Sequence, residues 1–227
     1  MIRLDNVTKS YRSGKVKIRA LDNVSLEIKQ GEFVLLNGPS GSGKTTFLNI
    51  AGCLTRVTSG RLFLEDQEIS HLPDHFLSAI RREKFGFIFQ QFNMIPGYTT
   101  WENVSIPLLP MGVSDKIRKK RAMNLLEELN LETRADFFAN ELSGGEQQRA
   151  AVARALINDP EVIMADEPLS NIDIKNAGMV IAILEKLKNK GKTIIISFHD
   201  SQPQIVKLID RMVFFDSGKI SSQTQLQ

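Results

Sequence analysis

Features that would place this sequence of 227 residues in several common protein classes are scarce or missing. It has a single cysteine, Cys53, so no disulfide can form within the chain, and its apolar neighbours predict a buried thiol. No apolar run approaches membrane-spanning length, and Met1–Asn6 lacks the apolar core of a secretion signal. The net charge is +3, too small to call for nucleic acid as a partner. We therefore expect neither an integral membrane protein nor a disulfide-built secreted domain.

What the sequence does contain is a series of short strand patterns. Ile2–Val7 and Leu21–Ile28 alternate apolar and polar residues, as half-buried strands do. Phe33–Asn37, Val162–Ala165 and Thr193–Ser197 are continuous apolar runs, which are typical of strands buried on both faces. Further strand candidates are Arg61–Glu65, Phe85–Phe89 and Met212–Phe215.

Helical patterns separate these strands, at Thr45–Leu54, Ser114–Leu129, Ser143–Ile157, Ile174–Leu187 and Gln202–Leu208. Strands that alternate with helices predict an α/β fold with a mostly parallel sheet covered on both faces. No strong strand pattern lies between Phe89 and Val162. We therefore predict one domain over residues 1–227, with a helical subdomain inserted at approximately 91–160.

The most specific motif is Gly38–Thr45, which fits the phosphate-loop pattern G-x-x-x-x-G-K-[ST]. A predicted buried strand enters it and a predicted helix leaves it, as that motif requires. Its glycines let backbone N–H groups curl around phosphate oxygens, and the helix adds its positive N-terminal end. We expect Lys44 to reach the β- and γ-phosphates and Thr45 to offer its hydroxyl to Mg²⁺.

Two carboxylates, Asp166 and Glu167, follow the buried run Val162–Ala165. In phosphate-loop enzymes an acidic residue at this place helps to hold Mg²⁺, and we assign that role to Asp166. Glu167 stands one residue further on, where a carboxylate can orient or deprotonate the attacking water.

The segment LSGGEQQR, residues 142–149, opens the predicted helix Ser143–Ile157. Ser143 can cap this helix, and Gly144 and Gly145 expose its first backbone N–H groups. An anion site and a capped structural helix explain these residues equally well, so physical chemistry alone leaves both open.

The segment is, however, the signature of the ATP-binding-cassette (ABC) ATPases, and the chain resembles that family along nearly its whole length. Other family markers occur in the family's order: Tyr11 for the aromatic residue that stacks on adenine, Gln90 for the Q-loop, Asp173 for the D-loop and His199 for the switch histidine. The resemblance implies the phosphate-loop ABC ATPase fold. That fold has a mostly parallel sheet core, an antiparallel β subdomain and a helical insertion.

The resemblance also implies ATP hydrolysis, with ATP and Mg²⁺ as cofactors. Two cassettes of this family meet head to tail, and each signature completes the partner's γ-phosphate site. The residues implied for ATP binding are Tyr11, Gly38, Pro39, Ser40, Gly41, Ser42, Gly43, Lys44, Thr45 and Thr46. The residues implied for catalysis are Glu167, His199 and Gln90. The residues implied for contact across the dimer are Ser143, Gly144, Gly145, Glu146 and Asp173. The residues implied for binding Mg²⁺ are Thr45, Gln90 and Asp166.

Two stretches, Asn49–Leu54 and Ile80–Asn93, resemble the lipoprotein-release and macrolide-export branch, which also includes ATPases of antimicrobial-peptide resistance. That branch implies an integral-membrane permease as partner and a place on the inner face of the cell membrane. A second interpretation stays open: a nucleotide-switched regulatory cassette that signals through a membrane partner, as in cell division. The switch segment Ser197–Asp200 and the D-loop residues 167–173 depart from the family's common forms, which leaves rate and inter-site coupling open.

Surface expectations complete the sequence analysis. We expect the permease to contact Gln91–Tyr98 and the helix starting near Thr99, through exposed Phe92, Met94, Ile95 or Trp101, although these side chains fill a core equally well. The basic run of Lys116, Arg118, Lys119, Lys120 and Arg121 indicates a solvated helix face, with anionic lipid as the alternative. His71 and His75 are expected to be surface residues and not metal ligands.

Overall fold

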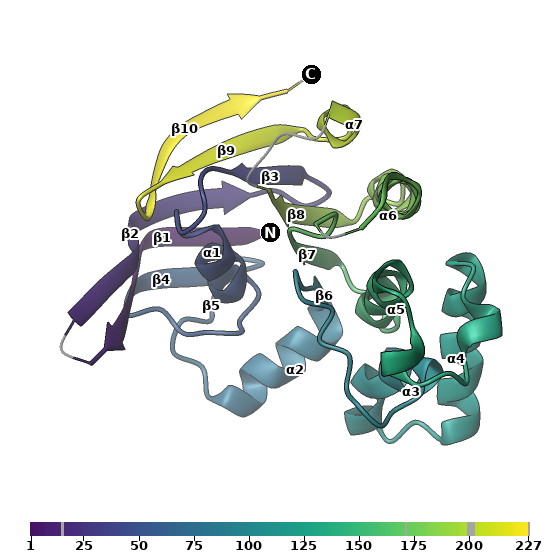
Figure 1. The fold of residues 1–227 in the computed structure, drawn as a ribbon. Coiled ribbons are helices and arrows are strands. Elements are labelled where there is room, and N and C mark those ends of the chain that lie inside the picture. Colours follow the sequence, from purple (N-terminus) through teal and green to yellow (C-terminus); the bar gives the residue numbers. More distant parts are fainter. Residues whose placement is uncertain (15, 171, 199–202, 227) are drawn as a thin grey trace.

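The computed structural model describes residues 1–14, 16–170, 172–198 and 203–226, and its framework is two β-sheets (Figure 1). One sheet has, in spatial order, β10 (Lys219–Gln225), β9 (Arg211–Asp216), β3 (Phe33–Asn37), β8 (Thr193–Ser197), β7 (Val162–Asp166) and β6 (Phe85–Ile88). The other has β2 (Val16–Ile28), β1 (Ile2–Ser13), β4 (Ser59–Leu64) and β5 (Gln67–Glu68). The strands from β9 to β6 pair in parallel, whereas β10 and the whole second sheet are antiparallel.

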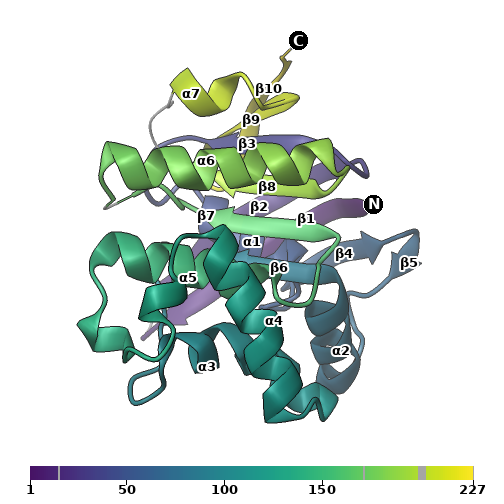
Figure 2. The ribbon, with the colours of Figure 1, turned by 90° about the vertical axis from the view of Figure 1, so that its right-hand side faces the viewer.

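The helices are α1 (Lys44–Ala51), α2 (Asp74–Lys84), α3 (Thr100–Ser105), α4 (Asp115–Glu128), α5 (Gly144–Leu156), α6 (Ile174–Asn189) and α7 (Pro203–Val206). Short 3₁₀ helices are η1 (Ile106–Met111), η2 (Glu132–Arg134) and η3 (Ala139–Glu141). Figure 2 shows α5 and α6 lying across one face of the six-stranded sheet, with α3 and α4 beside α5. We call residues 91–160, which hold α3 to α5, the helical subdomain.

The side chains of the central strands pack alternately into two separate hydrophobic cores, because successive residues of a strand point to opposite faces. Phe33 and Leu35 of β3 belong to the cluster formed with α4, α5 and α6. Val34 and Leu36 belong to the cluster formed with α1 and the antiparallel sheet. The central strands are therefore buried on both faces, as their continuous apolar runs predicted, and the predicted fold class is confirmed.

The antiparallel strands β1 and β2 are longer than the sequence patterns predicted. β1 and β2 continue well beyond Val7 and upstream of Leu21, because register shifts at three places interrupt the alternation that marks a strand. α2, β5 and β10 were not predicted at all. The predicted helix Thr45–Leu54 ends early, at Ala51, because Gly52 closes it and Cys53 follows with a left-handed φ of 62°.

Candidate functional site

The predicted phosphate loop, residues 38–45, connects the end of β3 to the start of α1. Gly38 begins the loop with a φ of 138°, which residues with a Cβ rarely adopt. A Cβ added there would lie only 2.1 Å from the carbonyl oxygen of Phe215 in β9. Glycine is therefore required at this position both by the backbone conformation and by the approach of the neighbouring strand.

The N-terminus of α1 is open to an anion. Its N-cap residue is Gly43, no side chain accepts a hydrogen bond there, and its first turn contains no acidic residue. Such an end presents unpaired N–H groups and the positive end of the helix dipole. A pocket of about 380 Å³ lies over it, lined by Ala20, Ser40, Gly41, Ser42, Gly43, Lys44, Thr45, Thr46, Gln90 and Glu167. The structure thus brings most predicted phosphate-binding residues together with two predicted catalytic ones.

The Lys44 side chain binds the backbone of the phosphate loop. Its Nζ donates hydrogen bonds to the carbonyl oxygens of Gly38, at 2.6 Å, and Pro39, at 2.9 Å, and the residue is buried. Burial lowers the pKa of Lys44, while the carboxylates of Glu167 and Asp166 act in the opposite direction. A phosphate in the loop would offer this ammonium group charged acceptors, which bind it more strongly than neutral carbonyl oxygens.

Glu167 and Gln90 come from distant parts of the chain and meet at this pocket. Gln90 Nε2 donates to Glu167 Oε2 at 3.0 Å, and Ser170 Oγ donates to the same oxygen at 3.2 Å. The Glu167 N–H donates to both the carbonyl oxygen and the hydroxyl of Ser197. Glu167 has a φ of 44°, an unusual conformation for glutamate, so these contacts hold a strained residue in place.

Ser197 also fixes Asp166, the last residue of β7. The two residues lie opposite each other in the parallel pair β7–β8, and Ser197 Oγ donates to Asp166 Oδ1. The sequence analysis did not select Ser197 for this role. Its place at the end of the predicted strand Thr193–Ser197 was the available signal, because parallel neighbours end at one sheet edge.

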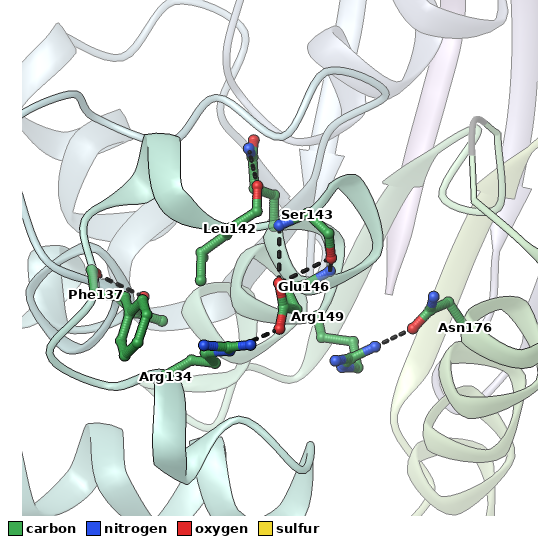
Figure 3. Close-up of polar contacts among 9 residues, drawn as sticks. Arg134, Phe137, Leu142, Ser143, Glu146, Arg149 and Asn176 are labelled. Carbon is green, nitrogen blue, oxygen red and sulfur yellow. Dashed lines mark hydrogen bonds and ion pairs between the residues drawn. The ribbon is translucent and has the colours of Figure 1, made fainter.

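At the N-terminus of α5 a carboxylate occupies the helix end (Figure 3). Glu146 Oε2 accepts hydrogen bonds from the N–H and the Oγ of Ser143, both at 2.8 Å, and the Glu146 N–H donates back to Ser143 Oγ at 3.4 Å. Arg134 Nε donates to Glu146 Oε1 at 2.9 Å. The hydrogen bonds from Ser143, together with Arg134, hold the pKa of Glu146 below its usual range. No motif in the sequence pointed to Arg134.

The N-terminus of α6 lies against that of α5. Asp173 caps α6 by accepting a hydrogen bond from the Asn176 N–H at 2.9 Å, and Arg149 donates to the Asn176 side chain. A Cβ added to Gly145 would lie 2.3 Å from Asn176 Nδ2, so a larger residue there would require the Asn176 side chain to move. Figure 3 shows Asn176 reaching from α6 toward Arg149. The residues predicted to act across a dimer are therefore gathered at two adjoining helix ends.

These helix ends are separate from the phosphate-loop pocket. Among the residues that the structure describes, none of Ser143, Gly144, Gly145, Glu146 and Asp173 lines that pocket. Within one chain the two halves of the predicted γ-phosphate site are therefore not assembled.

Tyr11, predicted to stack on adenine, lies on β1 outside the pocket lining. It pairs across the strands with Ile18 of β2, and its side chain is 41% exposed. Lys9 Nζ lies 5.0 Å from the centre of its ring. The ring thus lies at the surface, with Lys9 over it.

Three other expectations concern histidines and the cysteine. His199 lies outside the described residues. His71 and His75 are exposed, and no group of three or more potential metal-binding side chains was found within the described ranges. Cys53 is buried, as predicted, and burial raises the pKa of its thiol to about 11.

The basic run of α4 divides into two groups. Arg118 is buried and donates to Asp115 and Ser105, and Lys119 donates to Asp136. Lys119, like Lys116, Lys120 and Arg121, is exposed. The predicted solvated face is thus correct for these four and wrong for Arg118.

A family model described as "ABC transporter" matches residues 21–170. The chain belongs to the ABC transporter family. This finding confirms the resemblance given by the signature, and the chain is an ATP-binding ATPase of that family. None of the helices in the described part of the chain is long and apolar enough to span a bilayer.

Two relatives, and a solved structure of one of them, are similar to this chain along most of its length. The uncharacterized ABC transporter ATP-binding protein MJ0796 of Methanocaldococcus jannaschii is 44% identical, with 100% of this chain and 98% of that protein covered. The macrolide export ATP-binding/permease protein MacB of Hyphomonas neptunium is 44% identical over 96% of this chain and 35% of that protein. The solved dimeric structure of a post-hydrolysis state of MJ0796, bound to ADP and Pi, has a TM-score of 0.94 at 43% identity and covers 100% of this chain and 99% of that one. The name of the second relative is consistent with the resemblance to the macrolide-export branch.

Replacing Lys44 by alanine tests the pocket over α1. The ammonium group is the buried cation of the loop, and a hydrogen bond to a charged group contributes about 1.5–3 kcal/mol. We expect Lys44→Ala to weaken ATP binding by about tenfold to a hundredfold, as measured by titration with a fluorescent nucleotide. It should also abolish ATP hydrolysis, as measured by phosphate release. The exposed residue Lys120, changed to alanine, is the control. Near-normal hydrolysis by Lys44→Ala would refute the assignment.

Proposed function

We propose that this cassette drives a separate membrane permease of the macrolide- or lipoprotein-export type, or of antimicrobial-peptide resistance, by closing a dimer around two ATP molecules. The observation that carries the proposal is the separation, within one chain, of the α5 and α6 helix ends from the phosphate-loop pocket. A dimeric structure of a close relative and a relative named as an ATP-binding and permease protein in one chain support it. On this proposal the cassette lies on the cytoplasmic face of the membrane, held there by its permease.

In this proposal the residues of the pocket bind the triphosphate. Backbone N–H groups of the loop and the open end of α1 hold the phosphate oxygens, and Lys44 neutralises the β- and γ-phosphates. Tyr11 stacks on adenine through its exposed ring. The ATP-binding set is Tyr11, Gly38, Pro39, Ser40, Gly41, Ser42, Gly43, Lys44, Thr45 and Thr46.

The residues proposed for Mg²⁺ suit that ion chemically. Thr45 and Gln90 line the same pocket, and Asp166 ends the neighbouring strand β7. Because Gln90 donates to Glu167 through its nitrogen, its amide oxygen is the atom that would meet a cation. Hydroxyl, amide and carboxylate oxygens are hard ligands of the kind that Mg²⁺ prefers. The bound ion would neutralise charge on the β- and γ-phosphates.

Glu167 is the proposed general base. Gln90 and Ser170 both donate to its Oε2, which fixes the orientation of the carboxylate beside the pocket. A base in this place can orient the attacking water and accept its proton. His199 is proposed to contact the γ-phosphate.

The α5 and α6 ends are proposed to complete the site of a second copy. Ser143, Gly144 and Gly145 would meet the γ-phosphate bound by the partner's loop, with Glu146 and Asp173 beside them. Ser143 and Asp173 are exposed in the single chain, which such a contact requires.

The permease is proposed to insert a segment into an apolar groove beside the Gln91–Tyr98 stretch. This groove, of about 360 Å³, runs between α2, β6, η1 and α5. Phe87 and Phe89 form one wall, with stacked rings 5.9 Å apart. Its other apolar lining residues include Leu54, Pro107, Pro110 and Ile157.

The apolar residues named from the sequence contribute less to an exposed surface than expected. Met94 and Trp101 pack against the core of the helical subdomain, and Phe92 is half-buried. Only Ile95 of the four is exposed, at 40%. The carbonyl oxygens of Phe92 and Asn93 accept hydrogen bonds from Arg154 of α5, which ties this stretch to the helix.

Glu167→Gln tests the nucleotide-driven dimer. The amide keeps the size of the side chain but cannot accept a proton, so ATP should stay bound and intact. We expect a stable dimer with Mg-ATP and a monomer without nucleotide, as measured by light scattering after size exclusion. The parental chain, which turns ATP over, serves as control. A variant that stays monomeric in saturating Mg-ATP would count against the proposal.

Leu54→Glu tests the groove. Leu54 is 41% exposed and lines the groove without lining the phosphate-loop pocket. A buried charge at an apolar contact is costly, so we expect about tenfold less permease to co-purify, with the ATPase rate of the isolated cassette unchanged. Ile117→Glu, at an exposed position on α4 outside the groove, is the matched control. Equal permease recovery by both variants would refute this docking site.

A further inference from the structure

The carboxylate of Glu146 occupies the place where an anion would bind to α5. Its Oε2 holds both the N–H and the hydroxyl of Ser143 at 2.8 Å. A serine hydroxyl has one proton, so it cannot donate to Glu146 and to a phosphate at the same time. If Ser143 contacts the γ-phosphate of a second copy, its hydroxyl must first turn away from Glu146.

The N-termini of α1 and α5, which would face each other across ATP in the proposed dimer, differ in charge. The first turn of α1 contains no acidic residue, whereas the first turn of α5 contains Glu146. An ionised carboxylate within a few ångströms of a triphosphate repels it unless a cation compensates the charge. Hydrogen bonds from Ser143 keep the pKa of Glu146 low, so the group is charged at neutral pH.

Arg134 supplies the compensating charge. Its Nε lies 2.9 Å from Glu146 Oε1, the oxygen that Ser143 does not use. Figure 3 shows Arg134 and Ser143 meeting Glu146 from different directions. Arg134 can therefore keep its hold on the carboxylate while Ser143 releases it.

Contacts other than the one to Glu146 also restrain Arg134. Its guanidinium lies 4.7 Å from the centre of the Phe137 ring. The following backbone is anchored to the start of α3: the Trp101 N–H donates to the Ala135 carbonyl oxygen at 3.0 Å, and the Thr100 N–H to the Phe137 carbonyl oxygen at 2.8 Å. A guanidinium held in this way loses little entropy when it retains the carboxylate.

We propose that Arg134 is a positioning residue of the ATP site completed by a second copy: it balances the charge of Glu146 and retains that carboxylate when the Ser143 hydroxyl turns to the γ-phosphate. This inference rests on the proposed ATP-dependent dimer. Glu146 then competes with the γ-phosphate for the hydroxyl of Ser143, and Arg134 determines how strongly Glu146 competes.

The test is a double-mutant cycle in the Glu167→Gln chain, which does not consume its ATP. The variants are Arg134→Ala, Arg134→Lys, Glu146→Gln and the double variant Arg134→Ala/Glu146→Gln. Two quantities are measured for each: the dimer Kd in saturating Mg-ATP, by sedimentation velocity, and the ATP affinity of the monomer, by fluorescent-nucleotide titration. Arg121→Ala is the control, because Arg121 is an exposed arginine of the same subdomain for which no ion pair occurs among the described residues.

We expect Arg134→Ala to raise the dimer Kd by about tenfold or more, because each dimer contains two such sites with an uncompensated carboxylate. The ATP affinity of the monomer should not change. Arg134→Lys should restore at least part of the loss. Once Glu146 is glutamine, removal of Arg134 should change the Kd by less than about twofold, and Arg121→Ala should have no effect.

Three results would overturn the inference. An unchanged dimer Kd for Arg134→Ala would show that the dimer does not need a cation to compensate the Glu146 carboxylate. An equal loss with glutamate and with glutamine at position 146 would show that Arg134 acts only through the fold. A Glu167→Gln chain that does not dimerise at all would refute the proposed function, and this inference with it.

Discussion

Parallel pairing of β3, β8 and β7 is the constraint on which the proposed catalytic edge of this cassette depends. Leu36 of β3 and Asp166 of β7 both lie opposite Ser197 of β8, so three buried strands end together. Beyond those ends follow the phosphate loop and Glu167. A shift of one residue in any pair would turn apolar side chains from one core to the other, and the two cores therefore fix the register. Packing of the interior thus decides where the chemistry lies.

Helix N-termini give the site its electrostatic character. The end of α1 is left without a side-chain cap or an acidic residue, which suits a triphosphate. The ends of α5 and α6 are capped by Ser143 with Glu146 and by Asp173. Of these three described helix ends, that of α1 is thus open, whereas those of α5 and α6 are satisfied by side chains. On the proposed mechanism, the dimer forms when a partner's γ-phosphate displaces part of the α5 cap.

The sequence predicted the parts of this arrangement that are local. Gly38–Thr45 and the apolar runs of β3, β7 and β8 were sufficient for the fold class and for the pocket over α1. Gln90 was selected through the family resemblance and Glu167 through its place after a buried strand, but no spacing rule predicted that these two distant residues meet. The roles assigned to individual site residues remain predictions.

Contacts that depend on tertiary packing were not accessible in the same way. Arg134 and Asn176 contact α5 only because η2 and α6 fold against it, and a lone arginine or asparagine carries no motif. The bulges of β1 and β2 hid the length of the antiparallel strands. α2 was missed because its residues carry many charges and only Leu77 is buried.

A mixing experiment tests the central claim, that each ATP site is built from two copies. Chains with Lys44→Ala lack the loop cation, and chains with Ser143→Arg lack the contact across the dimer. A mixed dimer contains one site with both residues intact, so the account predicts that ATP hydrolysis appears on mixing two inactive preparations. If each site is complete within its own chain, the mixture will be no more active than the sum of its parts, and the account is contradicted.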